Sequence, residues 1–491
     1  MGGSLGTVDL TIVGLYLAAT FGVGFWASRG NRKLSDYLLG NRNMPWWAVL
    51  FSIVATESSI VTFLSVPGTV SKIEGVPNTG TMAFLQLPLG YVLGRYLVVA
   101  LLLPAYFRGE LFSAYQILGE RFGGNTKRVA SLIFIVARTV ADGLRLYLAA
   151  MLLQQAFDAD LRSTIVVVGA ATLIYTYFGG VKAVIWTEVA QFAIKVIGTL
   201  VAGIVVYQAA GGWNEVMAFG HSSGASRVFD FEFSLTRPYT FWAGLVGGAF
   251  LSLASHGVDQ MMVQRYLCAG NLRSASRALA LSGWVVLVLF TMVLMVGLGL
   301  AAYYAKFPPA EPFTKTDQIF KTFVLNRDLM PIGLIGLIVA AVLSAAMSTL
   351  SSSLNSAAGS LVSDWLQPAF GWSSENRASL VATKALTLVF GVLQILMAIR
   401  GEATTGAVVD QVLKIASITS GILLGLFFLG SFTKARESAA LLALIITASV
   451  IGYMAFYSPL AMPWFAVVSS IGLLMLGVVF EALFAALSRK P

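Results

Sequence analysis

Apolar runs of membrane-spanning length recur along this whole chain, and they constrain its fold more than any other feature. A helix that crosses a bilayer needs about 20 mostly apolar residues, because its backbone polar groups must be satisfied within the segment. Hydrophobic residues make up 57% of the sequence and charged residues only 11%. We count about thirteen spans of suitable length, near 7–28, 46–70, 79–105, 128–157, 162–179, 184–210, 240–264, 275–304, 330–365, 378–399, 406–429, 438–457 and 462–487. The sequence therefore predicts an all-α polytopic membrane protein in one transmembrane domain, 1–491.

Several other classes of protein are disfavoured by the composition. A lone cysteine, Cys268, excludes an internal disulfide, and two histidines leave little for a histidine-based metal centre. The net charge is +9, but the basic residues gather in short loops between spans, so we expect no nucleic-acid partner. The chain lacks an HExxH motif, a serine–histidine pairing in register and a paired-aspartate motif. We therefore expect no enzyme.

The basic loops also predict the orientation in the membrane. If the first loop is cytoplasmic, alternate loops carry most of the Lys and Arg, as the positive-inside rule requires. The N-terminus is then outside and the C-terminus inside, in a multi-pass plasma-membrane protein. The two longer segments, 211–239 and 305–329, become outer loops that can carry short helices. The basic residues of the first loop and the C-terminus that support this orientation are Arg29, Arg32, Lys33, Arg42, Arg489 and Lys490.

Two spans are interrupted by polar residues at matching positions. Residues 56–59 break the second span, and residues 252–257, followed by Asp259 and Gln260, break the span five further on. Because five is odd, these segments cross in opposite directions. Matched broken helices in inverted halves mark the binding site of many transporters. The halves are then 44–210 and 238–429, with 7–28 and 438–487 as additional helices.

The stretch 340–356 carries a dense array of side-chain oxygens inside an apolar segment. On a helix, Ser344, Ser348, Ser351 and Asn355 share one face, and further hydroxyls lie on the adjoining stripe at Thr349, Ser352 and Ser356. One interpretation is close helix packing, with hydroxyls bonding to carbonyls one turn earlier. The other is a cation site, because a hard ion such as Na⁺ prefers several oxygen ligands.

In several motifs the chain resembles the sodium/solute symporters, a family that includes bacterial sialic acid, proline and galactose symporters and the sodium–glucose cotransporters. The motifs occur in order along the chain, at 36–47, 52–56, 185–191, 257–260, 263–267 and 340–356. The resemblance implies a LeuT-like fold of 5+5 inverted-repeat helices that works by alternating access. It also implies sodium-coupled uptake of a small polar organic solute: a sugar, a sugar acid such as sialic acid, or another carboxylate.

The resemblance places sodium between the first broken helix and the hydroxyl array. Its ligands would be the carbonyls of Ala55, Ser58 and Ala345 and the hydroxyls of Ser348 and Thr349. Backbone hydrogen bonding supports this ligand set, because a helix break frees carbonyl oxygens that a continuous helix would use. A second sodium site, present in some members, would fall at Glu188, Ser351 and Ser352.

Glu188 departs from the pattern of the family, which usually has Asp there. The extra methylene displaces the carboxylate and puts the second sodium site in doubt. The alternative role of Glu188 is an ion pair with Lys182.

The solute is expected near the membrane midplane, between the two breaks. Arg145 lies in mid-span, where a charge is costly, and falls at or near the arginine that binds the carboxylate in the sialic acid symporters. Glu57 can instead neutralise Arg145, and Asp259 and Gln260 can cap a half-helix. We expect Arg138, Asp142 and Lys414 in structural pairs. The predicted solute residues are Glu57, Ser59, Thr62, Gln86, Arg145, Asp259 and Gln260.

Two alternative functions remain open at this point. A proton-coupled symporter of the same fold would use Glu57 or Glu188 as the titrating group, and a membrane sensor module would bind without transport. For the symporter, the expected partners are a sodium ion, a small solute and the lipid bilayer, with the protein acting as a monomer. Arg145 favours an anionic solute, whereas Glu57 favours a neutral sugar or polyol.

Overall fold

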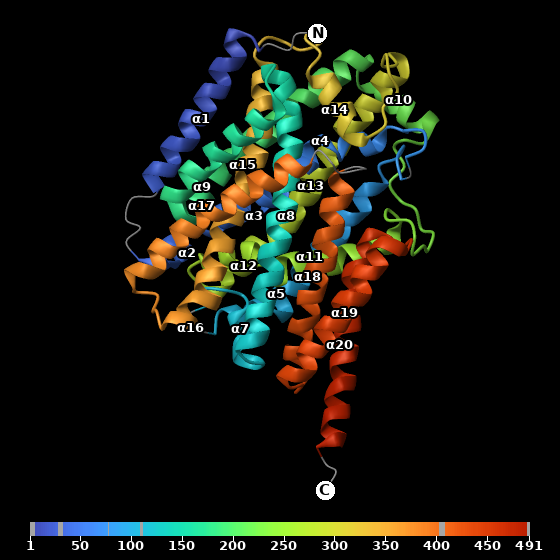
Figure 1. Cartoon of the computed structure of the whole chain (residues 1–491). Coiled ribbons are helices and arrows are strands. Elements are labelled where there is room, and N and C mark those ends of the chain that lie inside the picture. The colour runs from blue at the N-terminus through green and yellow to red at the C-terminus, as the bar shows by residue number, and fades with distance from the viewer. Residues whose placement is uncertain (1–4, 28–32, 77, 109–110, 402–407, 489–491) are drawn as a thin grey trace.

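A computed structural model of the chain describes residues 5–27, 33–76, 78–108, 111–401 and 408–488. Within these ranges all regular structure is helical, apart from one isolated backbone bridge between Met44 and Ala269. Figure 1 shows an elongated helical bundle in which the start of α1 and the end of α20 lie at opposite ends. The predicted all-α class is confirmed.

The first half of the chain runs from α1 to α9. α9 is continuous in length but contains a non-helical Gly180 with φ of 60°, so it covers the two predicted spans 162–179 and 184–210. The elements are α1 (Thr7–Ala27), α2 (Leu34–Leu39), η1 (Gly40–Arg42), α3 (Trp46–Glu57), α4 (Ile60–Leu64), η2 (Pro67–Val70), η3 (Ala83–Leu85), α5 (Gln86–Leu101), α6 (Leu103–Tyr106), α7 (Gln116–Arg121), α8 (Gly124–Phe157) and α9 (Leu161–Ala210).

The second half repeats the pattern of long helices with one broken span. The elements are α10 (Trp213–Ser223), η4 (Ala243–Gly247), α11 (Gly248–Gly257), α12 (Gln260–Leu267), α13 (Leu272–Lys306), α14 (Thr316–Val324), α15 (Leu334–Leu361), η5 (Val362–Leu366), α16 (Gln367–Phe370), α17 (Arg377–Arg400), α18 (Val408–Phe432), α19 (Glu437–Tyr457) and α20 (Met462–Leu487). Among the described residues, nine helices pass a membrane-span test on length and hydropathy, and the bent α3–α4 segment is a tenth. Counting α9 as two spans and adding α8 and the broken α11–α12 segment gives thirteen spans among the described residues, which agrees with the number predicted from the sequence.

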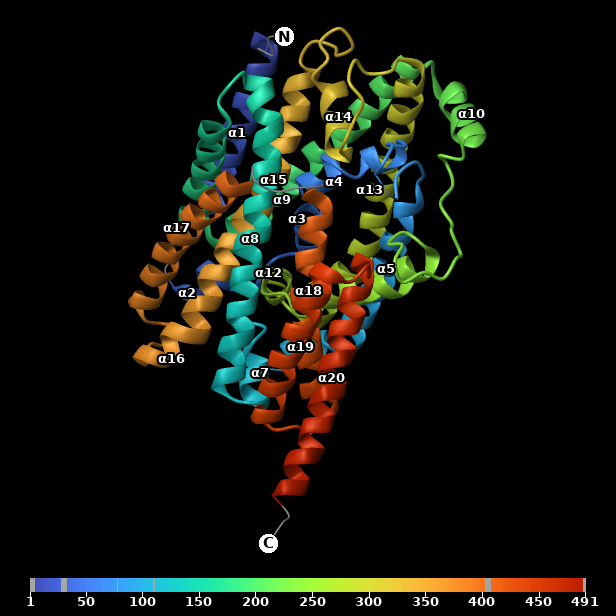
Figure 2. The same ribbon diagram turned by 45° about the vertical axis from the view of Figure 1, so that its right-hand side comes forward.

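The short helices divide between the two ends of the bundle. Figures 1 and 2 place α10 and α14 at the end where α1 begins, and α7 and α16 at the opposite end. The predicted outer loops 211–239 and 305–329 therefore lie on one side and carry the expected short helices. The direction of this side relative to the cell stays a prediction, and Arg29, Arg32, Arg489 and Lys490, which contributed to it, lie outside the described residues.

Helix α15 forms the centre of the bundle. Of its most apolar 18-residue window, 94% is buried, against 28% for α1 and for α17 and 22% for α20. α15 packs against α8, α9, α1 and α17, whereas α20 exposes apolar side chains such as Met475 and Leu483 that suit a lipid environment. The hydroxyl array predicted on 340–356 thus faces protein and not lipid.

Helices α5 and α11 approach each other through glycine. A Cβ on Gly90 would collide with the carbonyl oxygen of Gly244, and a Cβ on Gly94 with that of Ala249. Small residues at four-residue spacing let membrane helices pack backbone against backbone. This contact joins the first half of the chain to the second.

A larger residue on this surface should destabilise the protein. Gly90→Val should lower the melting temperature of the purified protein, because overpacking a fitted interface typically costs about 1–3 kcal/mol. Gly472→Val on α20 is the control, since a Cβ there meets nothing within 4 Å. Equal melting temperatures for the two variants would contradict the close α5–α11 contact.

Candidate functional site

The first broken span bends by 63° between α3 and α4. Ser58 and Ser59 separate the two helices, and the amide of Ser58 still bonds to the carbonyl of Val54 at 2.9 Å. Beyond this point the helical ladder stops. The carbonyl oxygens of Ala55 and Ser58 are then free to accept hydrogen bonds from other helices, as the sequence predicted.

The second broken span lies between α11 and α12. The Asp259 side chain accepts a hydrogen bond from the amide of Met261 at 2.9 Å and so caps α12. It also forms an ion pair with Arg138 on α8. The capping role considered for Asp259 is confirmed, and so is the structural pairing of Arg138.

The hydroxyl-bearing turn of α15 faces the first break. Ser348 Oγ lies 3.4 Å from the carbonyl oxygen of Ala55 and 3.2 Å from that of Ala345. Thr349 Oγ1 lies 3.4 Å from the carbonyl oxygen of Thr56 and 3.3 Å from that of Ala345. The structure therefore brings the predicted sodium ligands together, although Ser348 and Thr349 also form the back-bonds of the packing interpretation.

A lysine that the sequence analysis did not assign enters the same cluster. The Nζ of Lys195, on α9, lies 2.6 Å from the carbonyl oxygen of Ala55, 3.0 Å from that of Ser58 and 3.0 Å from Ser348 Oγ. Lys195 is completely buried. Its ammonium group thus uses three of the five ligands predicted for sodium.

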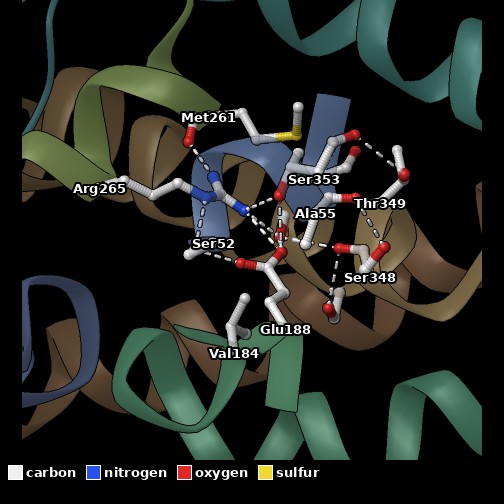
Figure 3. Close-up of polar contacts among 12 residues, drawn as sticks. Ser52, Ala55, Val184, Glu188, Met261, Arg265, Ser348, Thr349 and Ser353 are labelled. Atoms are coloured by element: carbon white, nitrogen blue, oxygen red, sulfur yellow. Dashed lines mark hydrogen bonds and ion pairs between the residues drawn. The ribbon is translucent and has the colours of Figure 1, made fainter. Parts of the chain in front are cut away.

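A second cation lies at the second predicted sodium site. The Arg265 guanidinium, on α12, bonds to the Glu188 carboxylate with Nη2 to Oε1 at 2.7 Å, and its Nε donates to Ser52 Oγ at 2.9 Å. Thr56 and Ser352 complete the network. Figure 3 shows Arg265 and Glu188 facing each other beside Ala55, Ser348 and Thr349.

This network corrects one sequence-based alternative. The alternative role predicted for Glu188 is an ion pair with Lys182 on the same helix. In the structure Glu188 instead forms an ion pair with Arg265, from the other half of the chain. Ser352 reaches the Glu188 carboxylate, whereas the Ser351 hydroxyl donates to the carbonyl of Ser348 at 3.2 Å. The reason is geometric, since α12 packs against α3 and α15 and brings its arginine into their shared interior.

A cavity lies between the two breaks. Both broken spans line it, together with α8, α13 and α18, and Thr349 of α15 borders it. Its walls combine charged and hydroxyl groups with aromatic rings. The charged and hydroxyl lining residues are Thr56, Glu57, Ser59, Thr62, Arg138, Arg145, Ser255, His256, Asp259, Thr349, Thr419 and Ser420, and the aromatic ones are Phe84, Tyr91, Phe134 and Phe290.

The charges around this cavity form pairs that the sequence leaves open. Glu57, predicted to contact the solute or else to neutralise Arg145, pairs with Arg95 of α5 and lies 3.6 Å from His256 Nε2. Arg145 pairs with Asp142, one turn earlier on α8. The Arg145 Nε is buried without a hydrogen-bond partner among the described residues.

Five of the seven predicted solute residues line the cavity: Glu57, Ser59, Thr62, Arg145 and Asp259. Gln86 and Gln260 do not. The Gln86 side chain donates to the carbonyl of Tyr239 at 3.0 Å and accepts from the backbone N–H of Asp230 at 3.1 Å. These two bonds fix the loop before η4.

Gln260 has the same kind of role for the loop before α7. Its side chain binds the backbone of Phe112 and Ala114 at 2.9 and 2.7 Å. Both amide side chains thus hold loop backbone in this arrangement, and their contact with a solute stays a prediction.

Sequence comparison places the chain among known proteins. A model of the sodium:solute symporter family matches residues 37–447. The chain belongs to this family. Human sodium-coupled monocarboxylate transporter 2 is 30% identical over 435 residues, covering 86% of this chain and 68% of that protein. The human sodium/iodide cotransporter is 28% identical (90% and 68% covered), and a putative sodium-dependent multivitamin transporter of Drosophila melanogaster is 30% identical (93% and 76%).

Comparison with solved structures supports the same family and the LeuT-like fold. A Na⁺-coupled sialic acid symporter, solved in a substrate-bound outward-open state, aligns with a TM-score of 0.85 and 27% identity, covering 97% of this chain and 98% of that one. The nucleobase–cation symporter Mhp1 shares the fold alone, with a TM-score of 0.62 and 14% identity over 91% and 94% of the two chains. The family consists of transporters, not enzymes, and it supports Na⁺ as the coupling ion.

The residues of this symporter can be tested against that ion. The five predicted ligands are all oxygens, as a hard cation requires. The Lys195 ammonium, however, lies within 3.0 Å of three of them. A sodium ion and this ammonium cannot share the position, so in the described arrangement the residues do not fit Na⁺.

Sequence reasoning missed Lys195, Arg95 and Arg265 as members of the site. Each is nearly or fully buried, and Lys195 and Arg95 lie within predicted spans. A basic residue inside a span is rare and marks a functional site by default. Lys195 and Arg95 carry this signal in the sequence, as Arg145 does.

The Glu188–Arg265 pair predicts a non-additive effect on stability. Glu188→Gln and Arg265→Gln should each lower the free energy of unfolding by about 3–5 kcal/mol, because each leaves a buried charge without its partner. The double variant should lose much less than the sum. Thermal unfolding of the purified protein measures this, with Lys182→Met on α9 as the control expected to change little. Additive losses would contradict the pair.

Proposed function

We propose that the chain is a secondary active symporter that takes up a small organic carboxylate together with a cation by alternating access. The observation that carries this proposal is the cavity between the two broken spans, which Arg145 lines while its buried Nε lacks a hydrogen-bond partner among the described residues. The relatives named for monocarboxylates and iodide, and the sialic acid symporter, handle anions.

Arg145 suits a carboxylate for electrostatic as well as geometric reasons. A guanidinium offers donors in a planar fork that matches a carboxylate. Asp142 accepts a hydrogen bond from only one nitrogen of the Arg145 guanidinium, Nη1. Asp142 is not among the residues that line the cavity. Because Arg95 and His256 accompany Glu57, Glu57 does not cancel Arg145, and the argument for a neutral solute weakens.

The rest of the cavity can hold the body of the solute. Ser59, Thr62 and Thr349 offer hydroxyls, and Phe84 and Tyr91 offer rings. Hydroxyls suit a sugar acid such as sialic acid, and rings suit the face of a sugar or the apolar part of a smaller carboxylate. A neutral sugar or polyol is the alternative solute.

Transport would use the two inverted halves, 44–210 and 238–429, with 7–28 and 438–487 as additional helices. The protein would act as a monomer in the plasma membrane, with its N-terminus outside and its C-terminus in the cytoplasm. Na⁺ is the ion that membership of the family supports. Thr349 belongs to both the cation site and the cavity wall, and its hydroxyl contacts the carbonyl of Thr56, which also lines the cavity, so a change at the cation site alters that wall.

Removing the guanidinium tests the proposal. In proteoliposomes, Arg145→Gln should raise the half-saturation concentration for a carboxylate about 10- to 150-fold, which corresponds to a lost charge-assisted hydrogen bond of about 1.5–3 kcal/mol. Labelled pyruvate and N-acetylneuraminate are the first probes, chosen after a thermal-shift screen that also includes glucose. Arg436→Gln, which removes a surface pair with Glu481, is the control and should leave uptake unchanged.

The screen also decides between the two classes of solute. Stabilisation and uptake of glucose, with no response to any carboxylate, would contradict the proposal. Uptake of a carboxylate that Arg145→Gln does not weaken would contradict the role of Arg145. Arg145→Lys should retain part of the affinity, because it keeps the charge and loses the fork.

A further inference from the structure

The segment between α10 and η4 exposes large apolar side chains on alternate residues. These residues, here called the phenylalanine face, are between 49% and 65% exposed: Phe229, Phe231, Phe233 and Leu235. The Phe229 and Phe231 rings are stacked, with their centroids 5.7 Å apart. In Figures 1 and 2 this green segment runs along the outside of the bundle after α10. A contiguous exposed apolar patch of this kind marks an interaction surface.

The polar residues that alternate with this face are bound within the segment itself. Arg237 forms ion pairs with Asp230 and Glu232. The Ser234 hydroxyl accepts hydrogen bonds from the backbone N–H groups of Thr236 and Arg237, at 3.2 and 3.1 Å. The segment is therefore amphipathic, with rings on one set of residues and paired charges on the other.

Hydrogen bonds fix this segment to the beginning of α20. The backbone N–H of Ala461 donates to the carbonyl of Leu235 at 2.8 Å, and Trp464 Nε1 donates to the carbonyl of Ser234 at 3.1 Å. The Phe233 ring lies 6.0 Å from that of Trp464. Because α20 exposes apolar side chains that suit lipid, the phenylalanine face continues a lipid-facing surface.

The end of α19 carries a second group of exposed aromatic side chains. Tyr453, Phe456 and Tyr457 are 67, 86 and 75% exposed. α19 ends at Tyr457 and α20 begins at Met462, so this group adjoins the connection to which the segment is bonded. Aromatic side chains gather where a membrane protein crosses the boundary between lipid and water.

We propose that the phenylalanine face lies in the interfacial region of the bilayer, with its rings among the lipid glycerol groups and the first part of the acyl chains. Lipid is the occupant because the face is continuous with the apolar surface of α20 and adjoins the aromatic end of α19. This inference does not depend on the identity of the solute.

The backbone of the segment is suited to this depth. Irregular backbone near the hydrocarbon region must have its polar groups bound inside the protein. The backbone N–H of Asp230 donates to Gln86 Oε1 at 3.1 Å, and its carbonyl accepts from the N–H of Phe241 at 2.6 Å. The carbonyls of Ser234 and Leu235 are bound at the start of α20.

The same segment is connected to the wall of the solute cavity. Gln86, which accepts from Asp230, also donates to the carbonyl of Tyr239. The Tyr239 ring lies 4.9 Å from that of Phe84, which lines the cavity. The proposed lipid contact is thus two hydrogen bonds and one ring contact away from the cavity.

Spin labels at single introduced cysteines test the inference. Cys268, the lone cysteine of the chain, is completely buried, so the wild type should take up no label. A nitroxide is attached to the full-length protein in phosphatidylcholine nanodiscs, one position at a time, at Phe229→Cys, Phe231→Cys and Phe233→Cys. Glu232→Cys is the matched control, because Glu232 lies between two of these residues and its side chain is 62% exposed.

Electron paramagnetic resonance then measures how often each label collides with O₂, which dissolves in lipid, and with a nickel chelate, which stays in water. The ratio of O₂ to nickel collisions should be severalfold higher at the three phenylalanine positions than at Glu232→Cys. It should approach the ratio at Leu483→Cys, on the exposed apolar side of α20.

Two results would overturn the inference. One is a ratio at all three phenylalanine positions as low as that at Glu232→Cys, which would place the face in water. The other is a low collision rate with both reagents together with dipolar broadening between labels, which would show that a second copy of the chain covers the face.

Discussion

Unpaired carbonyl oxygens in the interior of a membrane protein need a donor or a positive charge, because no bulk water is there to hydrate them. The break between α3 and α4 creates this need at Ala55 and Ser58. The structure meets it with the Lys195 ammonium and the Ser348 hydroxyl. Both groups come from helices that pack against α3, namely α9 and α15, and the cavity lies next to the break.

Two cations of the chain itself therefore stand where one sodium site was predicted and a second was considered. Lys195 is attached to α9 and faces carbonyl oxygens, and Arg265 is attached to α12 and faces the carboxylate of Glu188. Both positions retain the oxygen-rich lining that the family resemblance implies. Membership of the family thus accounts for the fold and for the oxygen-rich lining. The cation that occupies each position comes from a side chain on a neighbouring helix.

The features predictable from the sequence were those written in one local segment. The α3–α4 break, the α11–α12 break and the hydroxyl face of α15 each follow from residues within a single span, and the structure shows all three. Charge pairing was not predictable in this way. Glu57 forms its ion pair with Arg95 and not with Arg145, and Glu188 forms its ion pair with Arg265 and not with Lys182. Such a pair depends on which helices are neighbours and on the level of each residue along its helix axis.

The glycine contact between α5 and α11 has a consequence for how such a molecule can move. It packs a helix of residues 44–210 against a helix of residues 238–429, so α5 and α11 have little room to slide past each other. α3, which carries one side of the first break, packs instead against α9, α13 and α15. The bonds of Lys195 to Ala55 and Ser58 cross the plane where α3 meets α9 and α15. Any movement of α3 away from these two helices must therefore break two hydrogen bonds of this one side chain.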